Sequence, residues 1–231
     1  MNLAIVGYGK MGRLIEQLAP EYGCRVKLRL DVDNNSNFEG LTPENFRGID
    51  VAIEFSTPET VVENIERLAR LKVDTVVGTT GWGDQLWRAR EAVHAAGTGL
   101  VWGSNFSVGV YIFSQLVAEA AHLMARQPDY GAWAWEIHHA TKKDAPSGTL
   151  LSLVERMKHA GYERPISTGS NRAGAHPGTH EIGFDSQADT IAILHTARNR
   201  EGFARGALRA ARWVAGKKGF FEFRDIVKEL D

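Results

Sequence analysis

The sequence predicts an α/β protein in which an N-terminal domain with a parallel sheet is joined to an α+β domain with an open mixed sheet. Over the first hundred or so residues, short apolar runs alternate with stretches of helical period, which is typical of βαβ units. Beyond about residue 126, single apolar residues alternate with small or polar ones, which indicates strands with two unlike faces.

In the first part of the chain, the short apolar runs are clearly separated from the stretches that have a helical period. Thr57-Pro58-Glu59 is a good helix start, because Thr can cap, Pro suits the first helical position and Glu favours the helix dipole. The expected strands cover residues 3–6, 26–30, 51–55, 75–77 and 100–102, and the expected helices cover residues 11–19, 57–71, 84–96 and 107–126.

In the second part, strands are expected around Trp133 to Ile137, Ile182 to Phe184 and Ile191 to Ile193. A helix is expected over 201–214, and a short strand over 220–223 returns to the first sheet. The sequence has no internal repeat, low-complexity tract or flexible linker.

Composition limits the classes of function. The chain has 231 residues and is 43% hydrophobic, and its 27 Lys+Arg against 28 Asp+Glu give a formal net charge of -1. This balance provides no global field for nucleic acid, and no apolar run is long enough for a membrane span. Cys24 is the single cysteine and Met1 leads directly into a strand without a leader segment, so a cytoplasmic location is expected.

A glycine-rich turn follows the first predicted strand and precedes the first predicted helix. The first glycine permits a tight turn, the second lets the backbone approach a pyrophosphate, and the third permits close helix packing. The residues of the turn, all candidates for binding a nicotinamide dinucleotide, are Gly7, Tyr8, Gly9, Lys10, Met11 and Gly12.

Asp31 closes the next strand, about twenty residues on, where a carboxylate can accept the hydroxyls of the adenosine ribose. It should repel a 2'-phosphate and favour NADH, but Lys10 and Arg13 can offset that repulsion. The choice between NADH and NADPH therefore stays open.

Further cofactor contacts are expected where later strands end, because ligands of doubly wound sheets lie outside the carboxyl ends of the strands. Each of these short segments could also be a plain turn, but they coincide with successive strand ends. The candidates are Phe55, Ser56, Gly78, Thr79, Thr80, Gly103, Ser104, Asn105 and Phe106.

The segment 136–149 is the strongest candidate for chemistry. His138, His139 and Lys142 follow a strand, and their proton affinities can be tuned toward neutrality. Ser147, Gly148 and Thr149 then open a helix and can offer hydroxyl and N–H groups to an anion; no metal site is expected, because the adjacent histidines point to opposite faces of a strand.

The run HHxxKxDAPSGT over 138–149 resembles the dihydrodipicolinate reductase family. The resemblance also covers the glycine turn and the segments 77–81, 104–110, 178–181 and 203–207, and so nearly the whole chain. It implies a Rossmann-like cofactor domain over 1–105 with 208–231, and a domain for substrate binding and oligomerisation over 106–207.

The same resemblance implies NADH- or NADPH-dependent reduction of a cyclic dicarboxylate with loss of water, in diaminopimelate and lysine biosynthesis, by a homotetramer. It assigns proton transfer to His138 and Lys142, and substrate binding to His139, Ser147, Gly148 and Thr149. Two alternatives stay open: another amino-acid-linked NAD(P) dehydrogenase, and a non-enzymatic dinucleotide-sensing regulator.

Overall fold

The computed structural model describes residues 1–230 and divides them into two compact units. Unit 1 comprises residues 1–107 together with the chain from Glu201 onward, and unit 2 comprises Val108–Arg200. Within the described residues, no helix is long and apolar enough to cross a membrane.

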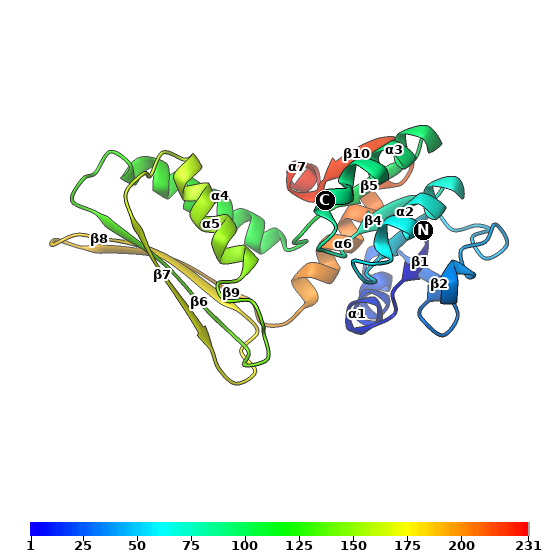
Figure 1. The fold of residues 1–231 in the computed structure, drawn as a ribbon, viewed down its shortest axis with the longest axis horizontal. Helices are drawn as coiled ribbons and strands as arrows, with labels where there is room; N and C mark the ends of the chain where they lie inside the picture. The colour runs from blue at the N-terminus through cyan, green and yellow to red at the C-terminus, as the bar shows by residue number, and fades with distance from the viewer. Residues whose placement is uncertain (231) are drawn as a thin grey trace. The chain divides into compact units, whose positions relative to one another are not determined.

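Unit 1 is built on a six-stranded parallel sheet with the order β10-β5-β4-β3-β1-β2 (Figure 1). Strands β1 and β3 are buried along most or all of their length, which means that helices cover both faces of the sheet. The strands are β1 (Asn2–Val6), β2 (Arg25–Leu30), β3 (Val51–Glu54), β4 (Asp74–Val77), β5 (Gly99–Trp102) and β10 (Gly219–Glu222).

The helices of unit 1 pack in two pairs, α2 beside α3 and α1 beside α6. They are α1 (Lys10–Leu18), α2 (Val61–Arg70), α3 (Leu86–Ala96) and α6 (Glu201–Val214), and the short α7 (Phe223–Ile226) follows β10. Single 3-10 turns cover Ala19–Tyr22, Ser36–Phe38, Gly83–Gln85 and Val227–Glu229.

The strand order reverses at β1, because β2 lies on one side of it and β3 on the other. In doubly wound sheets, this reversal opens a crevice at the carboxyl ends of the two central strands. The glycine turn after β1 and the segment after β3 therefore lie at the expected place for a ligand.

The predicted start of the second helix is wrong by four residues. Helix α2 begins at Val61, and its N-cap residue is Thr60, which makes no side-chain capping bond. The Thr57 carbonyl accepts hydrogen bonds from the N–H groups of Thr60 and Val61, both at 3.1 Å, so residues 57–60 form a turn before the helix. A sequence that suits a helix start also suits such a turn.

Unit 2 has a four-stranded mixed sheet with the order β7-β6-β8-β9, in which only β6 and β7 are parallel. Its strands are β6 (Gly131–His138), β7 (Ile166–Arg172), β8 (Thr179–Asp185) and β9 (Thr190–Thr196). Helices α4 (Val108–Met124) and α5 (Gly148–His159) pack together over one face (Figure 1).

The core of unit 2 lies between these helices and the sheet. Phe113 and Val117 of α4 and Leu153 of α5 pack on Ala134 and Ile182 of the sheet. The other face of β6 carries the larger apolar side chains Trp133, Trp135 and Ile137, which are only half-buried. Strand β7 is absent from the sequence prediction, because its polar sequence shows no apolar alternation.

The division into units differs from the predicted boundaries at 105 and 207. All of α6 belongs to unit 1, since Ala204, Ala207, Leu208 and Ala211 are buried and the helix packs on β3, β4 and β5. The predicted strand at 220–223 does join the first sheet, as β10 beside β5. The break thus falls at the start of α6.

Candidate active site

The glycine turn has the geometry that a dinucleotide needs. Gly7 has a φ of +92°, and a Cβ there would lie 2.1 Å from the Phe55 carbonyl oxygen, so only glycine fits. A Cβ on Gly12 would lie 2.5 Å from the Gly7 carbonyl oxygen, which explains close packing of the helix on the turn. A Cβ on Gly9 would meet nothing within 4 Å, so the backbone there borders open space. A pyrophosphate fits this arrangement, with the N–H groups that open α1 as donors.

An ion pair lies beside the turn. Tyr8 donates to Glu16 through its hydroxyl, and Arg29 donates to the same Oε2 atom at 2.9 Å. The hydrogen bond from Arg29 lowers the pKa of Glu16. Asp31 follows β2 directly, and its Oδ1 accepts from the N–H of Val32 at 3.0 Å. Glu16 therefore pairs with Arg29, and Asp31 lies at the strand end where a ribose hydroxyl is expected.

The carboxyl ends of β3, β4 and β5 converge. The ring of Phe55 lies against Gly78, where a Cβ would approach it to 2.1 Å, and its centroid is 6.3 Å from that of Phe106. Phe106 is itself buried against Phe223, at 4.6 Å between centroids, so its side chain belongs to the core. Candidate contacts from the remaining strand ends are the exposed Thr80 and Ser104.

A buried carboxyl group, Glu54, joins two of these strand ends. Its Oε1 accepts from the N–H of Ser56 at 3.2 Å and from Asn64 Nδ2 at 3.1 Å, and its Oε2 accepts from Thr79 Oγ1 at 2.6 Å. Ser56 Oγ also donates to Oε1. The side chain is fully buried, and this burial raises its pKa. Through these hydrogen bonds, Glu54 holds Ser56 and Thr79, two of the predicted cofactor residues, in place.

In unit 2, the end of β6 and the start of α5 meet around Glu136. Ser147 is the N-cap of α5, and its Oγ accepts from the N–H of Leu150 at 3.2 Å while donating to Glu136 Oε2. Its N–H donates to Glu136 Oε1 at 2.8 Å. The Ser147 side chain is therefore occupied within the protein, whereas Gly148 is exposed and Thr149 half-buried at the helix N-terminus.

Two further donors complete the shell of Glu136. Ser170 Oγ and Arg172 Nη2, both from β7, donate to Oε1 at 3.0 and 2.9 Å. Burial alone would raise the pKa of this carboxyl, but the hydrogen bonds from Ser147, Arg172 and Ser170 outweigh it and lower the pKa to about 2. Glu136 is thus a buried, ionised carboxylate.

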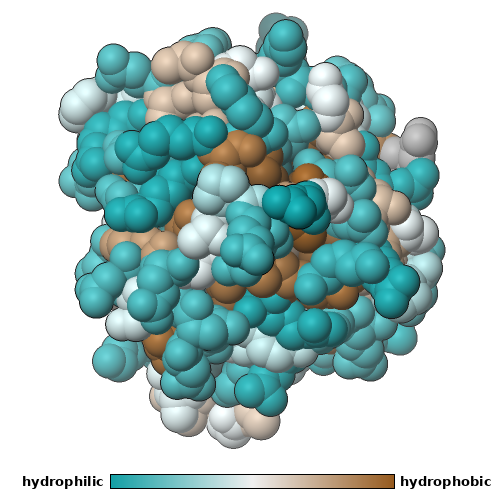
Figure 2. All heavy atoms as spheres, turned by 90° about the vertical axis from the view of Figure 1, so that its right-hand side faces the viewer, coloured by the Kyte–Doolittle hydropathy of each residue, from teal (hydrophilic) through white to brown (hydrophobic). Residues whose placement is uncertain are grey.

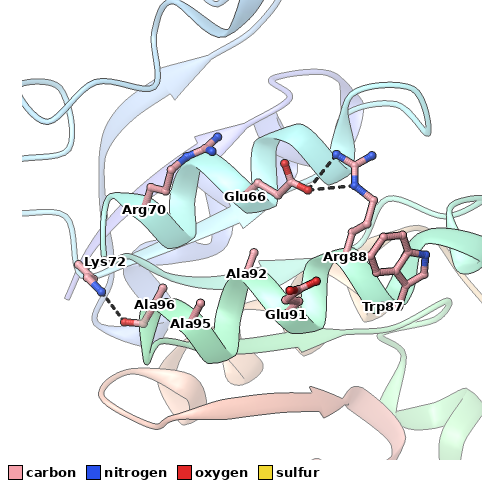
Figure 3. Close-up of a pocket in the computed structure, with 9 residues that line it drawn as sticks. All are labelled: Glu66, Arg70, Lys72, Trp87, Arg88, Glu91, Ala92, Ala95 and Ala96. Atoms are coloured by element: carbon pink, nitrogen blue, oxygen red, sulfur yellow. Dashed lines mark hydrogen bonds and ion pairs between the residues drawn. The ribbon is translucent and has the colours of Figure 1, made fainter.

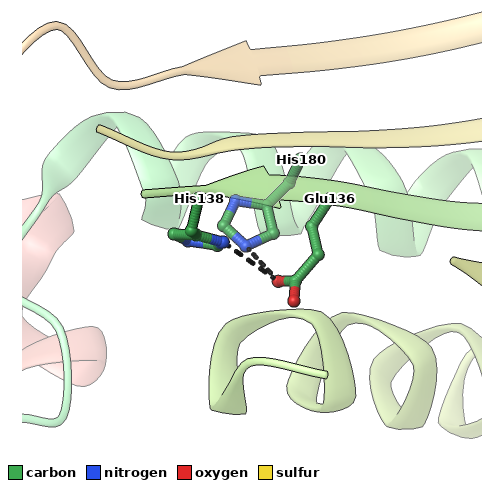
Figure 4. A group of neighbouring side chains, drawn as sticks. All are labelled: Glu136, His138 and His180. Atoms are coloured by element: carbon green, nitrogen blue, oxygen red, sulfur yellow. Dashed lines mark ion pairs between the residues drawn. The ribbon is translucent and has the colours of Figure 1, made fainter. Parts of the chain in front are cut away.

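Two histidines face this carboxylate (Figure 4). His138 Nδ1 lies 3.5 Å and His180 Nε2 lies 3.3 Å from Glu136 Oε2, and the two rings meet edge to face. Burial lowers the pKa of both rings, that of His180 to about 4, so both are neutral near pH 7. Gly178 leaves room for His138, since a Cβ there would lie 3.0 Å from Nε2.

Glu136, His138 and His180 lie close enough together to share a metal ion. However, Oε2 already accepts from Ser147, and Arg172 places a positive charge on the same carboxylate. A metal ion would have to displace the Ser147 hydroxyl and remain beside the positive charge of Arg172. The donor set therefore fits a hydrogen-bonded carboxylate better than a metal ligand.

The remaining predicted residues lie on the loop between β6 and α5. Lys142 Nζ pairs with Asp144 Oδ1 at 2.7 Å, and His139 Nδ1 lies 2.8 Å from Thr141 Oγ1. Both side chains are partly exposed and belong to the same loop that leads to the N-terminus of α5. This end of unit 2 therefore combines the Lys142 cation, several imidazole and hydroxyl groups and the N-terminus of α5, where the Gly148 N–H donates to Asp144.

A groove of about 600 Å³ elsewhere in unit 1 carries none of this chemistry. It lies between α2 and α3, with Trp87 and Ala92 on one side and an ion pair of Arg88 with Glu66 at 2.9 Å across it (Figure 3). Lys72 Nζ donates a hydrogen bond to the Ala96 carbonyl at 2.6 Å.

Figure 2 shows a mainly hydrophilic surface on the right-hand side of the view in Figure 1, with smaller hydrophobic areas within it.

Comparison with known proteins decides the family. The sequence models of the N-terminus and the C-terminus of dihydrodipicolinate reductase match residues 1–106 and 109–227. The chain belongs to the dihydrodipicolinate reductase family.

Relatives of this reductase family cover the whole chain. A protein of Christiangramia forsetii named 4-hydroxy-tetrahydrodipicolinate reductase is 36% identical, with 100% of this chain and 99% of the relative aligned. One of Thermosipho africanus with the same name is 32% identical, with 99% of each aligned. The dipicolinate-bound dihydrodipicolinate reductase of Paenisporosarcina shares the fold, with a TM-score of 0.79 at 21% identity over 98% of this chain and 99% of that one.

The residues at the centre of both candidate sites, Glu54 and Glu136, were not predicted from the sequence. Each is an acidic residue near the end of a strand, and nothing in the local pattern marks it as buried. The pairing of β6 with β8 brings His180 opposite Glu136, which is a fact of register and not of sequence spacing. The one signal available in the sequence was that each acidic residue lies inside a predicted strand, 51–55 or 133–137.

Proposed function

We propose that this protein reduces 4-hydroxy-tetrahydrodipicolinate to tetrahydrodipicolinate with loss of water, using NADH or NADPH, in diaminopimelate and lysine biosynthesis. The observation that carries the proposal is the arrangement at 136–149: two groups suited to proton transfer, His138 and Lys142, stand beside the N-terminus of α5. Membership of the family and relatives that bear this activity in their name support it.

A substrate with two carboxylates needs local positive charge and oriented donors. The N–H and hydroxyl of Thr149 can donate to one carboxylate, and the Gly148 N–H can do so where the substrate replaces Asp144, its present acceptor. His139 and Lys142 add further donors. Ser147 was a candidate for direct contact, but its hydroxyl and N–H both go to Glu136. We therefore propose that Ser147 holds the turn and that its neighbours bind the substrate.

Proton transfer is the chemical task of this chain. Loss of the hydroxyl group as water leaves a conjugated C=C/C=N system in the substrate, and the nicotinamide dinucleotide, when bound, supplies a hydride to one end of it. Electron density then develops at the other end, and a proton from Lys142 or His138 completes the reduction. Lys142 can leave Asp144 for the substrate because both side chains are on an exposed loop.

Both reduced dinucleotides are proposed as hydride donors. Asp31 at the end of β2 favours NADH, because it would repel a 2'-phosphate, and Lys10, exposed in the glycine turn, favours NADPH. The experiment that tests the function is oxidation of NADH and of NADPH by the purified protein supplied with freshly generated 4-hydroxy-tetrahydrodipicolinate. Absence of turnover with either dinucleotide would overturn the proposal.

A homotetramer is proposed on the free face of the unit 2 sheet. Trp133, Trp135 and Ile137 are half-buried there, and Leu194, which is 59% exposed, lies across the sheet from Trp135. A second copy of this face would cover these side chains. Replacement of Leu194 by Lys should reduce the mass found by light scattering; an unchanged mass would argue against this face.

Two other functions remain as outcomes of the same assay. Another amino-acid-linked dehydrogenase would oxidise NADH with a different substrate, and a dinucleotide sensor would bind NADH without turnover. The run 138–149 and membership of the family favour the reductase, because another dehydrogenase has no need of that run and a sensor has no need of His138 and Lys142. We also propose that the enzyme works in the cytoplasm, where reduced dinucleotide is available and Cys24 stays a thiol.

A further inference from the structure

One polar atom in the candidate site of unit 2 lacks a partner. His138 Nδ1 is buried and makes no hydrogen bond within the described residues, although Glu136 Oε2 lies 3.5 Å away. Buried polar atoms are nearly always paired, so such an atom requires an explanation. Hydrogen bonds of catalytic groups are often long before substrate binds and tighten during the reaction, which accounts for this one.

We propose that Glu136 is the positioning residue of proton transfer: it takes the Nδ1–H of His138, so that Nε2 is the atom that exchanges a proton with the substrate. This inference rests on the proposed function and extends it to a residue outside the HHxxKxDAPSGT run. A carboxylate behind a catalytic imidazole selects its tautomer and stabilises its charged form without itself taking the proton.

The carboxylate is rigidly held for this task. Three donors, the Ser147 N–H, Ser170 Oγ and Arg172 Nη2, fix Oε1 at 2.8, 3.0 and 2.9 Å, which leaves Oε2 turned toward the imidazoles. At the opposite side of the His138 ring, Nε2 packs against Gly178, where a Cβ would lie only 3.0 Å away. The two ring nitrogens therefore have different surroundings: Nδ1 faces a carboxylate and Nε2 faces an uncharged glycine.

The charges around His138 agree with this assignment. Glu136 and Asp144 favour the charged ring, while Lys142 and Arg172 disfavour it, as does burial. His180, the other imidazole at Oε2, is neutral near pH 7 and does not neutralise the carboxylate. Glu136, 3.5 Å away, has the largest effect of these charged groups, so the charged form of His138 depends chiefly on it.

The decisive variant is Glu136→Gln, which keeps the size of the side chain and removes its charge. We expect kcat to fall by about a hundredfold or more, since an amide behind a catalytic histidine costs up to about ten-thousandfold. In the plot of kcat against pH, the limb that reflects protonation of His138 should move to lower pH. Glu136→Asp, which keeps the charge, should restore part of kcat and move the pH limb part of the way back. If Glu136 had only a structural role, the pH limb would not move.

Glu155→Gln is the matched control, because it makes the same substitution at an exposed position of α5 in unit 2. It should change kcat less than about threefold and leave the pH limb in place. An unshifted limb and near-normal kcat in folded Glu136→Gln would overturn the inference.

A second measurement does not depend on turnover. Nitrogen-15 NMR of labelled protein, with the His138 signal assigned from its loss in His138→Gln, should show neutral His138 protonated on Nδ1 in the wild type and on Nε2 in Glu136→Gln. A wild-type ring protonated on Nε2 would refute the positioning role even if the Gln variant fails to fold. If the assay shows no reductase activity while the tautomer is as expected, the proposed function fails, and only the assignment of the His138 Nδ1–H to Glu136 stands.

Discussion

Two buried carboxyl groups near strand ends, Glu54 and Glu136, differ in charge because of their neighbours. In the described part of the chain no ion pair reaches Glu54, and four neutral donors do not outweigh its burial, so its pKa is raised. Glu136 has Arg172 in addition and a pKa of about 2. Burial therefore shifts Glu54 toward its neutral form, whereas Glu136 is held as a charge.

Residues of the 136–149 segment should separate into chemistry and binding. Lys142→Ala should lower kcat by a factor on the order of a hundred to ten thousand, the usual loss for a positioned proton donor, and His138→Ala should do the same. Thr149→Val should mainly raise KM, because its hydroxyl holds a carboxylate equally in ground and transition states. Steady-state kinetics, with circular dichroism to verify folding, measures both; near-normal kcat in the first two variants would contradict their roles.

Cofactor choice should respond in opposite directions to two side chains at the dinucleotide site. Asp31→Ala removes a repulsion from the 2'-phosphate and should raise kcat/KM for NADPH relative to NADH. Lys10→Ala removes an attraction and should lower the same ratio. The comparison uses the ratio of the two kcat/KM values in each variant. If neither ratio moves, the discriminating contacts lie elsewhere.

At the scale of elements, the βα turn at Gly9 should be separable from the rest of the fold. Gly9 has no positive φ and its surroundings are open, so Gly9→Val should fold normally, while the new side chain fills the space meant for the pyrophosphate. Calorimetry should show loss of NADH binding. Gly131→Val is a matched control, since Gly131 is also exposed, has open surroundings and lies in unit 2. Unchanged affinity in folded Gly9→Val would refute the site.

Most elements follow from the sequence because their apolar periods are local. The βαβ alternation predicts β1 to β5 and their helices, and the return of β10 to the first sheet follows from its aromatic run. Strand β7 does not follow, because Ile166–Arg172 is polar and becomes a strand only by pairing with β6. Thr57 illustrates the opposite failure, in which a suitable capping residue forms a turn instead.

The candidate site was predictable as a run of residues but not as a network. Residues His138 to Thr149 are contiguous, so their types and order are visible in the sequence. The partners that tune them, Arg172 from β7 and His180 from β8, come from strands whose register no local pattern specifies. The sequence thus predicts the groups that we propose to meet the substrate, and the fold supplies those that set their charge.

At the scale of the whole molecule, the two buried carboxyl groups should give opposite pH dependences of stability. The folded protein binds the Glu54 proton more tightly than the unfolded chain does, so stability is lost as pH rises from about 4.5 through the raised pKa. Glu136 behaves inversely: its contribution is fully present above about 4.5 and is lost as pH falls toward about 2.

Gln variants isolate these contributions, because all other groups titrate alike in wild type and variant. The free energy of unfolding of Glu54→Gln, relative to wild type, should rise between pH 4.5 and pH 8, since Gln never carries the buried charge. That of Glu136→Gln should be most unfavourable near neutral pH and recover as pH falls below 4.5. Urea denaturation across this range measures both differences, and the pH slope rather than the absolute change is diagnostic, because Gln also alters hydrogen bonds. Slopes of the same sign would show that one of the two carboxyl groups has been assigned the wrong charge.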